Sequence, residues 1–400
     1  MSHEVINRLY SLGKLSPLDV HFAGLLIRLN KQPAPEVELA AAMTSWYTRQ
    51  GHICLDLARL AAITPVIGSR TMHTLDVAAW RQKLANSRLV GHPGEYKPLI
   101  LDQTGRLYLY RYWEYQNKLA GALRTRLEES PVLPEANALR DGLARLFPAQ
   151  GSEVDYQKVA AFAAVSKSFC VVSGGPGTGK TTTVAKILAL LLESADRNDL
   201  RLALAAPTGK AAARLQEAIK QAKQHLNCSD RIKQAIPETA STLHRLLGSL
   251  PGSPYFRHNE TNLLQLDVLV VDEASMVDLA LMSKLLQALH PHTRLILLGD
   301  KDQLSSVEAG AVLGDICGCG DPERFSQSFT AACREIWGCR LDPTRSSEAV
   351  APMSQDCIIQ LQKSYRFAED SGIAVVSRAV RHNDADAVVA AFKEGKYPDL

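Results

Sequence analysis

A glycine-rich octapeptide, Gly174-Gly-Pro-Gly-Thr-Gly-Lys-Thr181, is the feature that most restricts how this chain can fold. It follows an apolar run expected to be a strand, Phe169 to Ser173, and precedes a run expected to be a helix, Thr182 to Leu192. In that context, Gly-x4-Gly-Lys-Thr is the pattern of a phosphate-binding loop. Glycines let the backbone N–H groups turn inward around phosphates, and the helix N-terminus adds partial positive charge. The octapeptide therefore predicts a P-loop domain.

The loop and its flanks supply the residues expected to hold a nucleotide. Lys180 is predicted to reach the β- and γ-phosphates, and Thr181 to offer its hydroxyl to Mg²⁺. Upstream, Gln157 either reads an adenine edge or is an ordinary surface glutamine. The cofactors predicted are ATP and Mg²⁺, and the predicted cofactor-binding residues are Gln157, Gly174, Gly175, Pro176, Gly177, Thr178, Gly179, Lys180, Thr181 and Thr182.

Strand and helix signals alternate from Val154 onward, which is typical of a parallel sheet covered by helices on both faces. The expected strands are Phe169 to Ser173, Leu202 to Ala206, Val268 to Val271 and Leu295 to Leu298. An open parallel sheet gathers its ligands at the carboxyl ends of its strands. The predicted fold class is α/β: a P-loop (RecA-like) parallel-sheet motor domain with a smaller, mainly helical N-terminal domain.

Acidic and amide side chains follow two of the later strands. Asp272 ends the run Leu269-Val-Val-Asp and is predicted, with Thr181, to hold Mg²⁺. Glu273 is the candidate to orient and deprotonate the attacking water, because a carboxylate one residue past a metal ligand can face the γ-phosphate. Gln303 follows the next strand as a possible sensor of the γ-phosphate. Arg366 has the planar, permanent charge that neutralises a transferring phosphate.

Basic residues are concentrated after the phosphate-binding loop. Residues 201–260 contain nine Lys or Arg against four acids, an excess of five, although the whole chain has a net charge of only +3. The strand end Ala206-Pro-Thr-Gly-Lys210 and the run Ser241-Thr-Leu-His-Arg245 are rich in groups that hold phosphates. For His244 alone, packing would be the simpler interpretation. The residues predicted to contact DNA are Pro207, Thr208, Gly209, Lys210, Thr242 and His244.

The composition limits the class of protein. With 46% hydrophobic and 22% charged residues, the chain has a globular composition. It has no secretory leader pattern and no apolar run near the ~20 residues that span a bilayer, so we expect a cytoplasmic protein. Cys317, Cys319, Cys333 and Cys339 cluster, but their spacing fits zinc knuckles poorly and favours reduced structural thiols.

The N-terminal region has its own signals. Ser16 and Pro17 predict a helix start, and Pro98 to Leu101 with Leu107 to Tyr110 predict a hairpin. The aromatics from Tyr108 to Tyr115 either stack bases or form a core. A helix is expected from about Gln116. The predicted domains are a partner-docking helical domain (1–115), a helical linker (116–150), a first RecA-like motor domain (151–350) and the start of a second (351–400).

In chain order, six of these segments resemble the motifs of superfamily 1 helicases, and within them the RecD family, the alpha subunits of the RecBCD helicase-nuclease (exodeoxyribonuclease V). The segments are Gly174 to Thr181, Ala206 to Arg214, Thr242 to Gly248, Asp272 to Met276, Gly299 to Leu304 and Lys363 to Phe367. The likeness extends from about residue 150 to 375, and residues 1–115 resemble that family's partner-docking domain less sharply.

The resemblance implies a 5′ to 3′ motor on single-stranded DNA in a heterotrimer with RecB- and RecC-like subunits that repairs double-strand breaks, with the nuclease on a partner. Such helicases have further motifs in the second motor domain that do not occur before Leu400, so the chain is expected to be truncated at its C-terminus. Two alternatives stay open: a P-loop ATPase that remodels protein, and a non-catalytic assembly subunit. The presence together of Lys180, Thr181, Asp272, Glu273, Gln303 and Arg366 disfavours the second.

Overall fold

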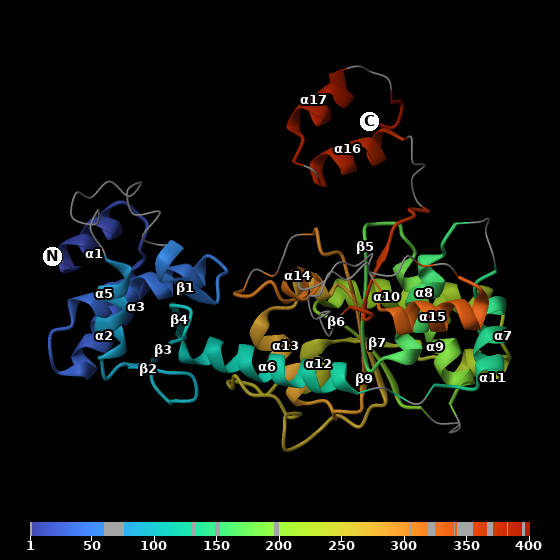
Figure 1. The fold of residues 1–400 in the computed structure, drawn as a ribbon, viewed down its shortest axis with the longest axis horizontal. Helices are drawn as coiled ribbons and strands as arrows, with labels where there is room; N and C mark the ends of the chain where they lie inside the picture. Colours follow the sequence, from blue (N-terminus) through green and yellow to red (C-terminus); the bar gives the residue numbers. More distant parts are fainter. Residues whose placement is uncertain are drawn as a thin grey trace. The chain divides into compact units, whose positions relative to one another are not determined.

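The chain forms two compact units (Figure 1). The computed structural model describes residues 2–59, 76–129, 131, 133–148, 153–195, 200–303, 306, 308–318, 325–339, 341, 355–365, 371–381, 383–393 and 397–400. The first unit is Met1–Ala120 together with Asp278–Lys284 and Ser306–Ala311, and the second is the remainder. Two short segments of the later chain therefore belong to the N-terminal unit.

The first unit combines helices with a small sheet. Its helices are α1 (Ser2–Ser11), α2 (Pro17–Asn30), α3 (Pro35–Arg49) and α5 (Val77–Ala85), and α6 (Tyr110–Glu128) begins in this unit. The strands are β1 (Cys54–Asp56), β2 (Val90–Gly91), β3 (Leu99–Leu101) and β4 (Arg106–Leu109), in the order β1-β4-β3-β2. Strands β3 and β4 pair antiparallel, which confirms the predicted hairpin.

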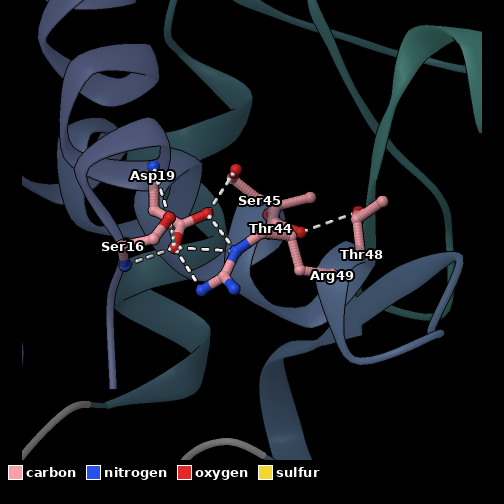
Figure 2. A network of polar contacts seen from close by, with 6 residues as sticks. All are labelled: Ser16, Asp19, Thr44, Ser45, Thr48 and Arg49. Carbon is pink, nitrogen blue, oxygen red and sulfur yellow. Dashed lines mark hydrogen bonds and ion pairs between the residues drawn. The ribbon is translucent and has the colours of Figure 1, made fainter. Parts of the chain in front are cut away.

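A buried carboxylate joins helices α2 and α3 (Figure 2). Asp19 is 0% exposed and completes a capping box with Ser16, as expected for a helix that begins Ser-Pro. It also accepts hydrogen bonds from the Ser45 hydroxyl (2.6 Å) and from Nη2 of Arg49 (2.7 Å). Burial alone would raise the pKa of Asp19, but the hydrogen bonds from Arg49, Ser45 and Ser16 outweigh it and hold the pKa below its ordinary value.

The start of α6 differs from the sequence prediction. The helix begins at Tyr110 rather than near Gln116. The pairing of β4 with β3 ends at the Leu99–Leu109 pair, and α6 starts at the next residue. Tyr108 and Tyr112 are 3% and 7% exposed, so these two aromatics belong to the core rather than to a base-stacking surface.

The second unit is built on a six-stranded, wholly parallel sheet with the order β10-β5-β9-β8-β6-β7. Its strands are β5 (Phe169–Gly174), β6 (Leu202–Ala206), β7 (Ala240–Thr242), β8 (Val268–Val271), β9 (Arg294–Gly299) and β10 (Ile358–Leu361). The four strands predicted from the sequence are confirmed. Every residue of β5 and β8 is buried, which explains why they read as unbroken apolar runs.

Helices precede, connect and follow these strands in the chain. They are α7 (Ala136–Leu146), α8 (Tyr156–Ser166), α9 (Lys180–Glu193), α10 (Gly209–His225), α11 (Asp230–Ala235), α12 (Leu243–Leu247), α13 (Leu279–Gln287), α14 (Val312–Gly318), α15 (Gln327–Trp337), α16 (Gly372–Arg381) and α17 (Ala385–Lys393), with a 3-10 turn, η2 (Ala274–Met276). Most of α13, up to Lys284, belongs to the first unit. The strand–helix alternation confirms the predicted α/β class. Helices α8 and α9 bury seven and nine residues, respectively, and most of them line the core of this unit.

Two negative observations apply to the described part of the chain. None of its helices is long and apolar enough to cross a membrane. Three of the four clustered cysteines, Cys317, Cys333 and Cys339, are free thiols, and burial raises the pKa of Cys333. Cys319 lies outside the described residues.

Candidate functional site

The phosphate-binding loop joins β5 to α9, and its path requires glycine. Gly177 and Gly179 have φ angles of 82° and 79°, in the left-handed region that side chains rarely adopt. A Cβ on Gly174 would lie 2.6 Å from Oγ1 of Thr178, whose hydroxyl donates to the carbonyl of Gly175 (2.9 Å). Both the curvature of the loop and its closest internal contact thus depend on glycine.

Lys180 is the first residue of α9, directly after Gly179 in the cap position. Its Nζ donates to the carbonyl of Gly174 and to that of Gly175 (3.2 Å), so the ammonium group lies against the loop backbone. Thr181 is half-buried and Thr182 is exposed in the first turn. The first N–H groups of a helix have no partner inside it, so this end of α9 can receive an anion.

Two segments from elsewhere in the chain support the loop. The Nε2 of Gln157, from α8, donates to the carbonyl of Thr178 (3.0 Å). The backbone N–H of Tyr365, which follows β10, donates to the carbonyl of Gly177 (2.8 Å). A Cβ on Gly179 would lie 2.6 Å from the Gln157 amide and 3.8 Å from the Tyr365 ring. Gln157 therefore contacts the loop itself, and adenine recognition by it stays a prediction.

The predicted metal and water residues follow β8. Burial raises the pKa of Asp272, an effect opposed by the N–H of Glu273 on its Oδ1 (2.9 Å) and by the charge of Lys180. In the parallel sheet only β9 lies between β5 and β8, so the loop and the end of β8 lie at the same carboxyl edge. Glu273 has a φ of 51°, a conformation that costs energy for a residue with a side chain. This turn leads the chain directly from the strand into η2.

The end of β9 lies beside the end of β5. Gly299 pairs with Ser173 in register, and the N–H of Lys301 reaches the Ser173 hydroxyl at 3.4 Å. In the turn that follows, the N–H of Gln303 donates to the carbonyl of Asp300 (3.2 Å), and the Gln303 side chain is exposed. The structure therefore places Gln303 at the same edge of the sheet as the loop, with its amide in solvent.

The predicted DNA contacts follow the two neighbouring strands β6 and β7, where Ala206 pairs with Thr242. Thr208 caps α10 and Thr242 caps α12, and each hydroxyl oxygen accepts a backbone N–H at 3.2 Å. A hydroxyl that accepts a hydrogen bond can still donate its own hydrogen to another group. Lys210 and His244 are exposed beside them. These four side chains thus lie at the carboxyl edge that also holds the nucleotide residues.

Three further residues were predicted from the sequence to contact DNA or phosphate. Pro207 is half-buried and Gly209 is exposed in the turn before α10. Arg366 lies outside the described residues.

Two groups that the structure brings to the site had no role in the sequence prediction. The Ser275 hydroxyl is buried in η2 and has no hydrogen-bond partner among the described residues, although it belongs to the run Asp272 to Met276. The Tyr365 N–H contact is a backbone contact, and a backbone donor leaves no trace in residue type. For Ser275, the only signal in the sequence that could have indicated a role in the site was its position in the run Asp-Glu-Ala-Ser.

Comparison with known proteins shows which proteins the chain is similar to. Residues 11–108 match the family described as "RecBCD enzyme subunit RecD, N-terminal domain", and residues 157–309 match an AAA domain family. The chain is 37% identical to the RecBCD enzyme subunit RecD of Haemophilus influenzae, over 97% of its own length and 64% of that protein. It is 39% identical to the Mycolicibacterium smegmatis protein of the same name, over 95% and 60%, respectively. Over nearly its whole length, the chain is therefore similar to RecD subunits.

A further relative is the ATP-dependent RecD2 DNA helicase of Deinococcus radiodurans, which is 36% identical over 58% of the chain and 28% of that protein. The chain spans about three fifths of the length of the RecD proteins that it matches. The AAA match begins at Gln157 and ends at Ala309, so it contains the loop, Asp272, Glu273 and Gln303. The family match thus covers the site that the geometry outlines.

Proposed function

We propose that this chain is the ATP-hydrolysing motor part of a DNA helicase subunit. The observation that carries the proposal is the strand order β5-β9-β8-β6-β7. It aligns the phosphate-binding loop, the Asp272-Glu273 pair and the Thr208 and Thr242 hydroxyls along one carboxyl edge of one sheet. Residues suited to ATP and residues suited to a phosphate backbone therefore follow adjacent strands.

In the proposed chemistry, Lys180 neutralises charge on the γ-phosphate and Thr181 and Asp272 hold Mg²⁺. The fit to a cation rests on Asp272, a half-buried carboxylate whose one hydrogen bond within the described residues, to Oδ1, leaves Oδ2 available. Mg²⁺ held by these residues would supply positive charge that offsets the charge of the phosphates. Glu273 accepts a proton from the attacking water, Gln303 senses the γ-phosphate, and Arg366 stabilises the transferring group.

The proposed movement along DNA follows from the pairing of β8, which leads to the nucleotide residues, with β6, which leads to the proposed DNA contacts. A change at Asp272 is transmitted to β6 through the ladder between β8 and β6, in which the N–H of Asp272 donates to the carbonyl of Ala205 (2.9 Å). Ala205 lies three residues before Thr208, so the grip on a DNA phosphate changes with the state of the nucleotide. The contacts are to the backbone, which makes the motor indifferent to base sequence.

The similarity to RecD subunits extends the proposal beyond this chain. The RecD relatives are named as subunits of the RecBCD enzyme. We therefore include RecB- and RecC-like partners, duplex-end and single-stranded DNA as substrate, 5′ to 3′ movement, a role in double-strand-break repair and recombination, and a cytoplasmic location. The nuclease activity belongs to a partner subunit.

ATP hydrolysis with and without single-stranded DNA tests the proposal. We expect oligo-dT to raise the rate, an ATP analogue to change the affinity for oligo-dT relative to ADP, and Lys180→Gln to lower hydrolysis at least ~100-fold. The alternative, a protein-remodelling ATPase, predicts hydrolysis that is normal but indifferent to DNA. Hydrolysis unaffected by DNA, together with DNA affinity unaffected by nucleotide, would refute the helicase assignment.

A further inference from the structure

A cavity lies at the amino edge of the parallel sheet, opposite the carboxyl edge that holds the phosphate-binding loop. It has a volume of about 400 Å³ and is lined by residues at the amino ends of strands, among them Ser168, Val268 and Arg294. The segment after α6 and the end of α9 close its other sides with Glu129, Pro131 and Leu191. All strands of the sheet run parallel, so this cavity is separated from the phosphate-binding loop by the length of a strand.

Charged side chains with an unpartnered buried atom occur in the wall of this cavity, at Glu129 and Arg294, and at Arg126, which lies three residues before Glu129 and does not line the cavity. In the described part of the chain, five buried side-chain polar atoms have no hydrogen-bond partner, and three of them are Nε of Arg126, Oε2 of Glu129 and Nε of Arg294. Arg126 is 2% exposed, and its other nitrogens donate to the carbonyls of Ala122 and His290 (3.0 Å each). Leaving buried charged groups without partners is costly, and native proteins rarely do so without a ligand or a function.

Burial affects both arginines in the same direction. It lowers the pKa of Arg126 and lowers that of Arg294 to about 10, and in each case the nearby carboxylate of Glu129 partly offsets the effect. The Oε1 of Glu129 is already engaged by Nδ1 of His292, which leaves Oε2 as the free acceptor. The three residues therefore form one electrostatic group.

The charges around the cavity indicate which charge a bound ligand would have. Asp267 also lines the cavity, but Arg201 neutralises its charge and donates two hydrogen bonds of 3.0 Å to its carboxylate. The guanidinium group of Arg294, which lines the cavity, and that of Arg126, which interacts with Glu129 without lining the cavity, then exceed the Glu129 carboxylate by one positive charge. A singly charged carboxylate neutralises this excess, whereas a phosphate dianion would place a second negative charge beside Glu129.

The remaining lining residues indicate which other groups the ligand would have besides its negative charge. The Oε2 of Glu129 requires a hydrogen-bond donor, and apolar contacts are available from Val165, Leu191 and Leu200. We propose that this cavity is a binding site for a peptide-like carboxylate: a carboxylate with a neighbouring N–H on an apolar group. Either a free acylated amino acid or the carboxyl terminus of a protein has this chemistry.

Ligand-observed NMR titration of the 400-residue chain with N-acetyl-L-leucine tests the site, with Mg²⁺ and saturating ADP present to occupy the phosphate-binding loop. We expect saturable binding with a dissociation constant in the millimolar range, typical of a ligand of this size. N-acetyl-L-leucinamide, which lacks the charge, should bind at least ~10-fold more weakly. No saturable binding, or equal binding of the acid and the amide, overturns the proposal.

Two variants locate the site. Arg294→Met keeps the length of the side chain and removes its charge, and it should weaken N-acetyl-L-leucine binding at least ~10-fold. Because it removes a guanidinium group whose Nε is buried without a hydrogen-bond partner among the described residues, it should leave the melting temperature of the chain unchanged or higher. Arg231→Met removes the same charge from an exposed position on α11 and should leave binding unchanged. Normal binding by Arg294→Met, or equal loss in the two variants, refutes the site.

A longer ligand separates the two sources of this chemistry. A blocked tetrapeptide that ends in leucine presents the same carboxylate on an extended chain. Binding much tighter than that of N-acetyl-L-leucine supports a protein terminus, and equal or weaker binding supports a free small acid. If Arg294→Met does not fold, the comparison of acid with amide on the unmodified chain still decides the proposal.

Discussion

Replacing Gln157 with alanine removes one side-chain hydrogen bond to the phosphate-binding loop. In the structure, Nε2 donates to the carbonyl of Thr178 at 3.0 Å from a half-buried position. A neutral hydrogen bond of this kind contributes about 0.5 to 1.5 kcal/mol. That range is equivalent to roughly a 2- to 13-fold change in a dissociation constant, so we expect Gln157→Ala to weaken ADP binding about 5-fold.

The same variant separates two roles of this glutamine. The bond to Thr178 uses one N–H, so Oε1 and the second N–H stay available to an adenine edge. If Gln157 only holds the loop, ADP and GDP lose affinity equally. If it also reads adenine, the loss for ADP exceeds the loss for GDP, because a site built to bond a base edge penalises the nucleotide that lacks the matching groups.

Calorimetric titration of the chain with ADP and with GDP measures both effects. Gln224→Ala, which removes an exposed glutamine from α10, serves as the control and should change neither affinity. Affinities of Gln157→Ala that stay within about twofold of the unmodified chain for both nucleotides would refute the loop contact. A loss confined to ADP would leave adenine recognition as the sole role of Gln157.

Four other side chains offer separate tests of the site and the fold. Glu273→Gln removes the proposed base but keeps its shape, so ATP should still bind while hydrolysis stops, and a loss of ATP binding in titration would make Glu273 structural. Because burial raises the pKa of Asp272, folding favours its neutral form. Asp272→Asn should therefore raise the urea midpoint of the nucleotide-free chain at pH 7, with the gain vanishing below about pH 4; a lower midpoint at pH 7 contradicts this. Lys210→Ala should weaken oligonucleotide binding alike for all sequences and flatten the salt dependence by about one phosphate, and an unchanged salt slope argues against the contact. Asp19→Ala should destabilise the first unit by about 3 kcal/mol in hydrogen-exchange measurements, against less than ~1 kcal/mol for Glu36→Ala, whose ion-pair partner Lys83 is exposed. Because hydrogen bonds hold the pKa of Asp19 low, this difference is present above the ordinary carboxyl pKa and lost as the pH falls through the lowered one; a difference that does not change with pH would contradict the assignment.

The sequence by itself determined the local elements and the residue types at the nucleotide site. Apolar runs such as Val268–Val271 predicted buried parallel strands, because such strands are covered on both faces. The glycines of the loop predicted a backbone turned in toward phosphates, and Gly177 and Gly179 do adopt the left-handed angles. These features depend on near neighbours in the chain, so periodicity and residue type suffice to find them.

Tertiary structure alone decided the contacts between distant segments. The hydrogen bond from Tyr365 to Gly177 joins the segment after β10 to the loop, and it uses a backbone N–H that every residue except proline possesses. The start of α6 at Tyr110 depends on where β3 stops offering partners to β4. The cavity beside Glu129 and Arg294 exists only because the sheet and its helices bring together the amino ends of strands far apart in sequence. Strand order, and with it which side chains meet at each edge, is set by packing of the whole unit, and no local pattern encodes it.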